Sequence, residues 1–276
     1  MSAHALRGSL APGPIAAAAV AVSAFLVLPL VAIVPMSFSD TRFLSLPRDG
    51  WSILHYRRLF GDPAWHDSLL HSVGVAVPAA CLALVFGLAF CLGAWQRQGA
   101  VVRVLRVLML GPLIVPAIIH AVAYHRMLSL LGLFDSFAGT VLVHAVKGLP
   151  FVVLSISAAL STVNPMTLQL ARSLGASQAR AIWSTLVPQI HQGMAIGFIL
   201  AFVTSWDEVV VTLFITSRHV NTLPKQIWQS LFLNLDPAVA ALGTLTLLAT
   251  LLVVLAMSLR GHRDRALAGA SEDGLN

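Results

Sequence analysis

Residues 164–188 read Asn-Pro-Met-Thr-Leu-Gln-Leu-Ala-Arg-Ser-Leu-Gly-Ala-Ser-Gln-Ala-Arg-Ala-Ile-Trp-Ser-Thr-Leu-Val-Pro and form the longest mixed polar stretch between two apolar runs. Asn164 suits the N-cap of a helix and Pro165 suits its first position, and Gly175 is placed to end that helix. Ser177 can cap a second helix directly afterwards. The stretch therefore predicts two short helices that are bent at a glycine.

Both expected helices are surface elements. Each is shorter than the roughly 20 residues that a spanning helix needs, and each carries an arginine, Arg172 or Arg180. Pro188 marks the point where the next apolar run is expected to begin. We therefore expect the two helices to lie at the membrane surface and to form a bent protrusion that contacts a partner outside the bilayer.

The rest of the chain is strongly apolar. Of its 276 residues, 58% are hydrophobic and only 10% are charged, which excludes a soluble domain with a polar coat. Long charge-free runs predict about six transmembrane helices rather than the alternating strands of a barrel. The expected helices are at about 15–37, 68–95, 104–128, 138–161, 189–216 and 237–259. A leader at 1–14, one transmembrane domain at 15–260 and a tail at 261–276 complete the expected organisation.

The third expected helix and the first long connection have special features. Gly111-Pro112 and Pro116 interrupt the hydrogen-bond ladder of 104–128, which is tolerated where neighbouring protein or water satisfies the freed carbonyl groups. In the connection after the first helix, residues 51–60 mix aromatic and basic side chains and predict an amphipathic interfacial helix.

The distribution of basic residues predicts the orientation in the membrane. Nine arginines fall on the side of the 164–188 stretch, against seven basic residues on the other side, where acidic residues nearly balance them. Because basic loops favour the cytoplasmic side, we expect the 164–188 stretch and both termini in the cytoplasm. The nine are Arg7, Arg97, Arg103, Arg106, Arg172, Arg180, Arg260, Arg263 and Arg265.

The segment 171–177, Ala-Arg-Ser-Leu-Gly-Ala-Ser, followed by Val187-Pro188, resembles the EAA loop of binding-protein-dependent ABC importer permeases. The resemblance implies that the loop is a coupling helix that docks in a groove of a cytoplasmic ATPase subunit. Gln169 replaces the family's usual glutamate, so no salt bridge to the ATPase is expected from this position. The alternative is an ordinary amphipathic loop between two spans. The residues implied in coupling are Gln169, Ala171, Arg172, Leu174, Gly175, Ala176, Ser177 and Pro188.

Two acids, Asp207 and Glu208, lie inside the fifth apolar run. A carboxylate inside a span costs about 2.5–3.5 kcal/mol on insertion scales. Adjacent side chains on a helix point about 100° apart, so at least one of the two acids is expected to face the bundle interior or a wet cavity.

The tract around these acids resembles the polyamine (spermidine/putrescine) subgroup of ABC permeases, with Trp206 in place of the usual phenylalanine. The resemblance implies that the acids face the translocation path, where carboxylates suit ammonium groups. The alternative is that they pair with Arg218, Lys147 or the backbone and hold the bundle together. For Lys147 we favour a position near the interface, to which its side chain snorkels. The residues expected along the path are Ser205, Trp206, Asp207, Glu208 and Thr212.

Catalytic and metal chemistry is not expected in this chain. A phosphate-binding loop needs a lysine followed by serine or threonine, but Lys147 and Lys225, the only lysines, are followed by glycine and glutamine. ATP is therefore expected on a partner subunit, and no cofactor on this chain. Histidine pairs spaced five apart do not share a helical face as a metal-binding pair would.

These observations predict an all-α membrane protein with about six transmembrane helices in a type I ABC importer permease-like bundle. The resemblance implies a multi-pass permease of the bacterial inner membrane that imports polyamines or a related small organic cation. Implied partners are cytoplasmic ATPase subunits, an extracytoplasmic solute-binding protein and a second permease subunit that is a different chain, with no nucleic acid. The rival hypothesis is an autonomous ion-coupled secondary transporter or channel, in which Asp207 and Glu208 relay protons or cations.

Overall fold

The computed structural model describes residues 14–48, 50–97, 99–234 and 236–252, so nearly all of the expected leader and the whole expected tail lie outside the described residues. The described chain is helical, and its only β-type pairing is an isolated antiparallel bridge between Ser39 and Trp51. It divides into two compact units, one that contains residues 63–229 and one that contains residues 14–62 and 230–252.

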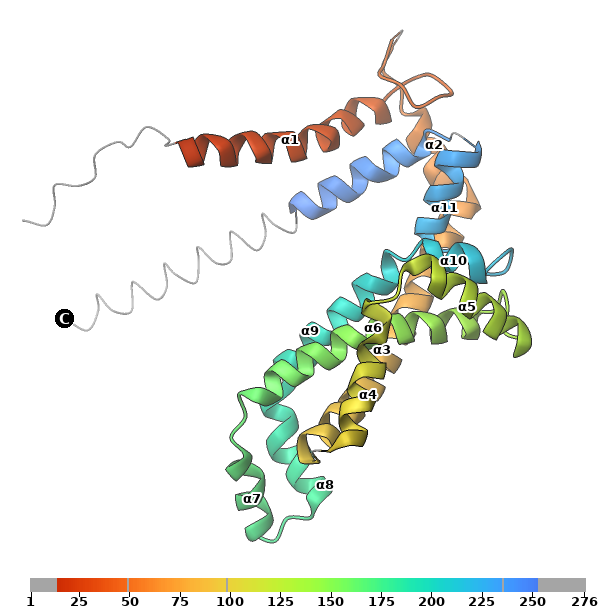
Figure 1. The fold of residues 1–276 in the computed structure, drawn as a ribbon. Coiled ribbons are helices and arrows are strands. Elements are labelled where there is room, and N and C mark those ends of the chain that lie inside the picture. The colour runs from red at the N-terminus through yellow and green to blue at the C-terminus, as the bar shows by residue number, and fades with distance from the viewer. Residues whose placement is uncertain (1–13, 49, 98, 235, 253–276) are drawn as a thin grey trace, which may run out of the picture. The chain divides into compact units, whose positions relative to one another are not determined.

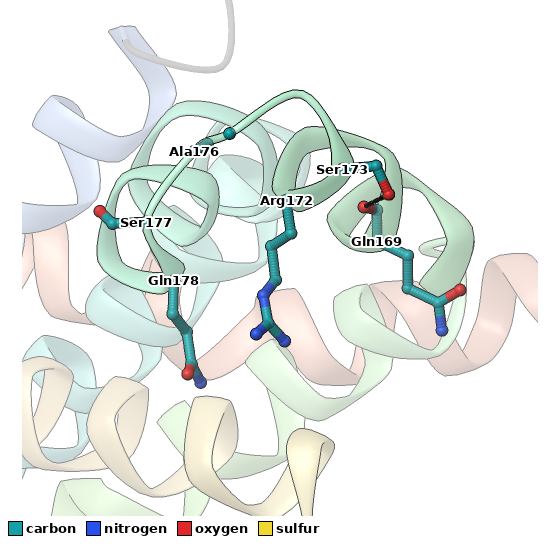
Figure 2. A pocket seen from close by; sticks show the side chains of 7 residues that line it. Gln169, Arg172, Ser173, Ala176, Ser177 and Gln178 are labelled. Atoms are coloured by element: carbon teal, nitrogen blue, oxygen red, sulfur yellow. Dashed lines mark hydrogen bonds between the residues drawn. The ribbon is translucent and has the colours of Figure 1, made fainter.

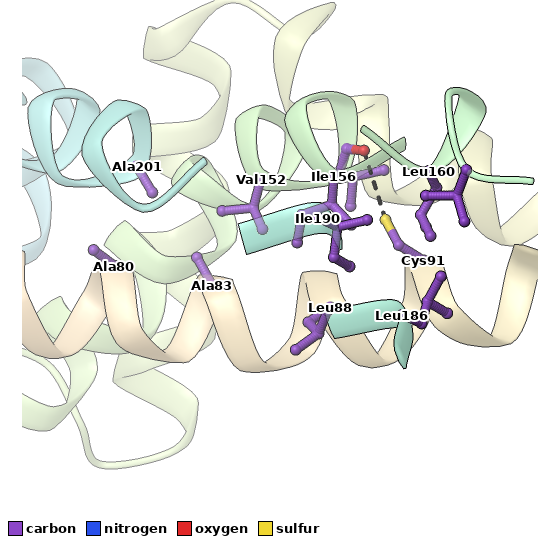
Figure 3. Packing of buried hydrophobic residues seen from close by; sticks show 12 residues of the cluster. Ala80, Ala83, Leu88, Cys91, Val152, Ile156, Leu160, Leu186, Ile190 and Ala201 are labelled. Carbon is purple, nitrogen blue, oxygen red and sulfur yellow. Dashed lines mark hydrogen bonds between the residues drawn. The ribbon is translucent and has the colours of Figure 1, made fainter. Parts of the chain in front are cut away.

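Three long helices form the core of the larger unit. They are α3 (Pro63–Gln96), α6 (Phe137–Ser161) and α9 (Val187–Trp206), which lie side by side (Figure 1). Small and branched apolar side chains fill the space between them (Figure 3). The buried residues of this cluster include Ala80, Ala83, Leu88 and Cys91 of α3, Val152, Ile156 and Leu160 of α6, and Ile190 and Ala201 of α9.

Glycine allows α6 and α9 to approach closely. A Cβ atom on Gly193 would lie 2.5 Å from the Cβ of Ala159 and 2.9 Å from the carbonyl oxygen of Ser155. Small residues at helix interfaces permit this kind of contact inside membranes. The close approach fixes α9 against α6 over its first half.

The lengths of the helices test the expected spans. Four helices among the described residues are long and apolar enough to cross a membrane: Ala16–Ser37, Pro63–Gln96, Phe137–Ser161 and Gln178–Trp206. Helix α4 (Ala100–Leu110) with the 3₁₀ turn Gly111–Leu113, and α5 (Ala117–Leu130), form a further pair that is bent by 107°. The apolar helix Ala238–Leu252 begins where the last span was expected, and residues after 252 are not described.

The bend in the third expected span occurs at the prolines that the sequence singled out. Pro116 is the N-cap of α5 and adopts φ −57° and ψ 142°, outside the helical region. Proline lacks the N–H group that would continue the ladder, so the helix stops before it and starts again after it. The fold class predicted from the sequence is confirmed, and the third expected span consists of two helices bent by 107° rather than one straight helix.

The smaller unit contains α1 (Pro14–Ser37), α2 (Leu54–Gly61), a π-helical turn at Ser230–Asn234 and the helix Ala238–Leu252. The Oγ1 of Thr244 lies 3.5 Å from the carbonyl oxygen of Ile33, so the last helix packs on α1. The hydroxyl groups of Ser37 and Tyr56 are 2.8 Å apart, which ties α2 to the end of α1. Helix α2 overlaps the stretch 51–60 where a helix was expected, and it begins three residues later.

Candidate functional site

The glycine-hinged loop has the local structure that its sequence predicts. The Oδ1 atom of Asn164 accepts the backbone N–H of Met166 at 2.9 Å and caps α7 (Pro165–Ser173). Gly175 has φ +89°, the left-handed conformation that glycine adopts without a steric cost. The Oγ atom of Ser177 accepts the N–H of Arg180 at 3.3 Å and caps α8 (Gln178–Ala181).

The second expected helix is not a separate short element. Pro188 lies at the start of α9 (Val187–Trp206), as expected, but no break separates α9 from α8. Helix α8 continues through a π-helical turn, Ile182–Leu186, into α9, which gives one helix of 29 residues, Gln178–Trp206. The N–H of Val187 donates to the carbonyl oxygen of Ile182, one residue further back than in an α-helix. This wider turn accommodates the proline, which has no N–H to donate. The loop is therefore attached directly to the fifth span.

The loop presents a polar depression with apolar surroundings. Its volume is about 660 Å³, and in Figure 2 the side chains of Arg172 and Gln178 point to the same side of it. Leu174, beside the glycine, is 89% exposed, and Met166, Leu170 and Trp183 are also exposed. Exposed apolar side chains with polar residues beside them are typical of a protein interaction site. The residues that line the depression are Gln169, Arg172, Ser173, Gly175, Ala176, Ser177 and Gln178.

Five of the residues implied in coupling line this depression, while three do not. Ala171 is half-buried on α7 and Leu174 stands exposed outside the depression. Pro188 is exposed on α9, beyond the π-helical turn. The predicted set is thus a continuous surface near the glycine, with Pro188 at some distance along the helix.

The fifth expected span, 189–216, is broken at its two acids. Helix α9 ends at Trp206, and the chain becomes helical again only in α10 (Val210–Ile215). Figure 1 shows α10 and the α7–α8 loop at opposite ends of the α3, α6 and α9 bundle. The break places Asp207 and Glu208 in different environments: Asp207 is exposed, whereas Glu208 is only 9% exposed.

Glu208 is bound inside the protein. Its Oε2 atom forms an ion pair with the Nζ of Lys147 on α6, and its Oε1 atom accepts the N–H of Val211 at 2.8 Å. The side chain of Lys147 is 13% exposed, so the expectation that it snorkels to an interface is wrong. The ammonium group of Lys147 stays inside the bundle because the carboxylate of Glu208 pairs with it.

A buried histidine to which sequence reasoning assigned no role joins the same network. The Nδ1 atom of His144 lies 2.8 Å from the Oγ of Ser205, and its Nε2 lies 3.1 Å from the Oγ1 of Thr212. The Oγ1 of Thr212 also donates to the carbonyl oxygen of Glu208 at 2.9 Å. His144 precedes Lys147 by three positions, so the two side chains share one face of α6. This spacing was the sequence signal that could have indicated a role for His144 beside Lys147.

The five residues expected along the translocation path therefore divide into two groups. Ser205, Glu208 and Thr212 are buried and bind His144, Lys147 or backbone. In contrast, Trp206 is half-buried and its ring stacks on Phe202 with centroids 5.7 Å apart, and Asp207 is exposed. Among the residues that the structure describes, no cluster could hold a metal ion.

An aspartate in the α5–α6 connection anchors the loop after α10. The carboxylate of Asp135 accepts the backbone N–H groups of Ser217 at 2.7 Å, Arg218 at 2.9 Å and His219 at 3.2 Å, and the ring Nδ1 of His219 lies 3.0 Å away. Burial acts to raise the pKa of Asp135, but these hydrogen bonds to the ionised form outweigh it, and the pKa lies well below its ordinary value.

A lysine holds the same loop from its other side. Lys225, on α11 (Leu223–Gln229), donates from Nζ to the Oγ1 of Thr216 at 2.8 Å and to the carbonyl oxygens of Ser217 at 3.0 Å and Val220 at 3.3 Å. Burial lowers the pKa of Lys225, and the charge of Asp135 partly opposes this shift. Neither anchor was found from the sequence, because each partner lies in a connecting segment without a motif.

Comparisons with known proteins agree with this architecture. The spermidine/putrescine transport system permease protein PotC of Escherichia coli is 30% identical over 243 residues, which cover 87% of this chain and 90% of PotC. The molybdenum transport system permease protein ModB of Mycobacterium tuberculosis is 30% identical over 217 residues, or 73% of this chain and 82% of ModB.

A solved structure shows the same fold. It is a bacterial ABC transporter involved in the import of the acidic polysaccharide alginate, and it matches with a TM-score of 0.65 at 16% identity over 88% of this chain and 93% of the matched chain. The family described as binding-protein-dependent transport system inner membrane component matches residues 16–266. The chain therefore belongs to this family, the permease subunits of ABC importers.

Proposed function

We propose that this permease subunit imports polyamines or a related small organic cation, and that Asp207 is the carboxylate that binds the cation in the translocation path. As an ABC importer permease, the chain is a non-enzymatic multi-pass membrane subunit, and ATP hydrolysis belongs to a separate ATPase subunit. Importers of this family also include a solute-binding protein and a second permease subunit.

The observation that carries the substrate proposal is the difference between two adjacent acids. Lys147 neutralises Glu208, whereas the exposed carboxylate of Asp207 has no ion-pair or hydrogen-bond partner among the described residues. An unpaired carboxylate at a break in a span is suited to a charge-assisted hydrogen bond with an ammonium group. The similarity to PotC supports a cation of the polyamine class.

The coupling part of the proposal rests on the loop 164–188. Gln169, Ala171, Arg172, Leu174, Gly175, Ala176, Ser177 and Pro188 form or flank the surface that receives the ATPase. Because α8 and α9 are one continuous helix, a displacement of the loop is passed along α9 to the break at Asp207. This arrangement requires the loop and both termini to lie in the cytoplasm and the pore to lie between this subunit and a second, different permease chain.

The experiment is uptake by the whole importer in proteoliposomes, with Asp207→Asn compared with wild type. Removal of one charge-assisted hydrogen bond, worth about 1.5–3 kcal/mol, is expected to raise KM for labelled spermidine about tenfold or more. ATPase subunits are expected to co-purify in normal amounts. An unchanged KM would refute the role of Asp207. A wild-type importer that carries only neutral or anionic solutes would refute the choice of substrate class.

A further inference from the structure

We propose that the C-terminal end of α3 and the adjoining α4 bind an anionic phospholipid. Its phosphate would lie among Arg97, Arg103 and Arg106, and one acyl chain would lie in the groove beside them. The inference rests on the proposed cytoplasmic position of the coupling loop and is independent of the transported solute.

Three arginines surround a depression at this end of the larger unit. The depression has a volume of about 350 Å³ and is lined by Arg97, Arg103 and Arg106 together with Trp95. Arg103 and Arg106 are three positions apart on α4 and so share a face. All three are exposed, and none forms an ion pair with an acid in the described part of the chain. The guanidinium groups are therefore available to an anion, and their planar geometry suits a phosphate.

A second, apolar depression adjoins the first. It has a volume of about 650 Å³ and extends between α3 and α4, away from the arginine cluster. Arg97 and Val102 line both depressions, so the positive charge lies at one end of the apolar groove. Gly93 contributes to the floor, and a Cβ atom there would meet nothing within 4 Å. The side chains along the groove are those of Ala89, Phe90, Ala94, Ala100, Val101, Val102 and Leu105.

Helix α4 has the properties of a helix at the membrane interface. It has no buried residue, its arginines share one face, and Val104 and Leu108 are exposed on another face. Amphipathic helices with basic residues lie at the boundary of head groups and acyl chains. The polar face and the apolar groove of α4 thus meet the two chemically different parts of one lipid molecule.

A hydrogen bond identifies the leaflet. The Nε2 of Gln178, on α8, donates to the Oε1 of Gln96, the last residue of α3. This end of α3 therefore lies on the same side as the coupling loop. Basic pockets between helices on the cytoplasmic side bind anionic head groups.

The shape of the groove favours a lipid over a protein partner. It reaches back along the spanning helix α3 as far as Ala89, which is seven residues before the end of α3 at Gln96. A cytoplasmic protein that docks on the loop can contact the arginines, whereas the groove continues along a helix that is long and apolar enough to cross a membrane. An acyl chain fills such a groove without leaving unsatisfied polar groups.

The test measures retained lipid in the assembled importer, purified from nanodiscs of phosphatidylcholine with rising fractions of phosphatidylglycerol, by native mass spectrometry. The triple variant Arg97→Gln, Arg103→Gln and Arg106→Gln is expected to lose bound phosphatidylglycerol at least several-fold. The matched control changes three exposed arginines elsewhere, Arg42→Gln, Arg57→Gln and Arg126→Gln, and is expected to retain it.

A second variant separates the groove from the charge. Gly93→Leu fills the groove, meets no neighbouring atom at its Cβ and leaves all arginines in place, and it is expected to lose the lipid as well. Phosphatidylglycerol retention equal to wild type in both the triple variant and Gly93→Leu would overturn the proposal. Loss of the ATPase subunit from the triple variant, with lipid unchanged in Gly93→Leu, would assign the face to a protein instead. Because lipid is measured without transport, failure here leaves the cation assignment intact.

Discussion

Removal of one member of the Lys147–Glu208 pair is expected to destabilise the protein far more than removal of the neighbouring Asp207. Both charges of the pair are nearly buried, at 13% and 9% exposure. Glu208→Gln leaves the ammonium group of Lys147 without a counter-charge, and Lys147→Met leaves the carboxylate of Glu208 without one. Breaking a buried ion pair in this way costs about 3–5 kcal/mol.

The double variant Lys147→Met with Glu208→Gln buries no charge at all. The hydrogen bond from Val211 to Oε1 can persist with glutamine. Replacement of a whole buried pair by neutral groups is often close to neutral in free energy, so the double variant is expected to cost much less than the sum of the two single variants. Asp207→Asn, at an exposed position one residue away, is expected to change stability by no more than about 0.5 kcal/mol.

The assay is thermal unfolding in detergent. Unfolding is monitored through the reaction of a fluorogenic maleimide with Cys91, which is buried in the folded protein. Cys81 is exposed and is first replaced by serine. With roughly 2–4 °C of Tm per kcal/mol for a chain of this size, the single variants are expected to lower Tm by about 6–20 °C. The reasoning fails if Glu208→Gln and Asp207→Asn shift Tm equally, or if the double variant shows the additive loss.

Three further predictions follow from single residues. Gly175→Trp, at φ +89° on the loop surface, is expected to leave the chain in the membrane but to abolish ATP-dependent uptake; undiminished uptake at equal membrane content would remove the coupling role. Gly193→Ala is expected to lower the free energy of unfolding by about 1–3 kcal/mol because the new Cβ overlaps Ala159. Gly93→Ala has open space around its Cβ and is expected to stabilise α3 by about 0.5–1 kcal/mol. Equal Tm values for the two variants would contradict this packing. The pKa of Asp135 is lowered by folding, so its contribution to the free energy of unfolding is present above the ordinary aspartate pKa of about 3.9 and is lost as the pH falls below it. Asp135→Asn is expected to reduce the fall in Tm at acid pH, and a fall in Tm equal to that of wild type would refute the role of Asp135 as an anchor.

The elements that could be predicted from the sequence are those fixed by neighbours along the chain. Asn164 and Ser177 cap their helices by accepting N–H groups two and three residues further along the chain. Gly175 ends its helix because glycine can adopt a positive φ. Pro116 interrupts the helix expected at 104–128 because it lacks one N–H group. These effects act within a single turn, so the local pattern contains the information.

The features that could not be predicted depend on partners far apart in sequence. Glu208 and Lys147 are 61 positions apart, and Asp135 and Ser217 are 82 apart. The sequence offered several partners for each acid inside the fifth span, and only the packing of α6 on α9 selects Lys147 for Glu208. The continuity of α8 and α9 was missed because a proline usually ends a helix, whereas a π-helical turn before Pro188 accommodates it here.

The most direct measurement is the accessibility of Leu174, the most exposed large hydrophobic side chain of the loop, with and without the ATPase. Leu174→Cys, in a chain with Cys81 and Cys91 replaced by serine, is treated with a membrane-impermeant maleimide in vesicles of both orientations. Labelling is expected only in inside-out vesicles, and bound ATPase subunits are expected to block it. Labelling from the outer face, or labelling that the ATPase leaves unchanged, would contradict the assignment of this loop as the coupling element.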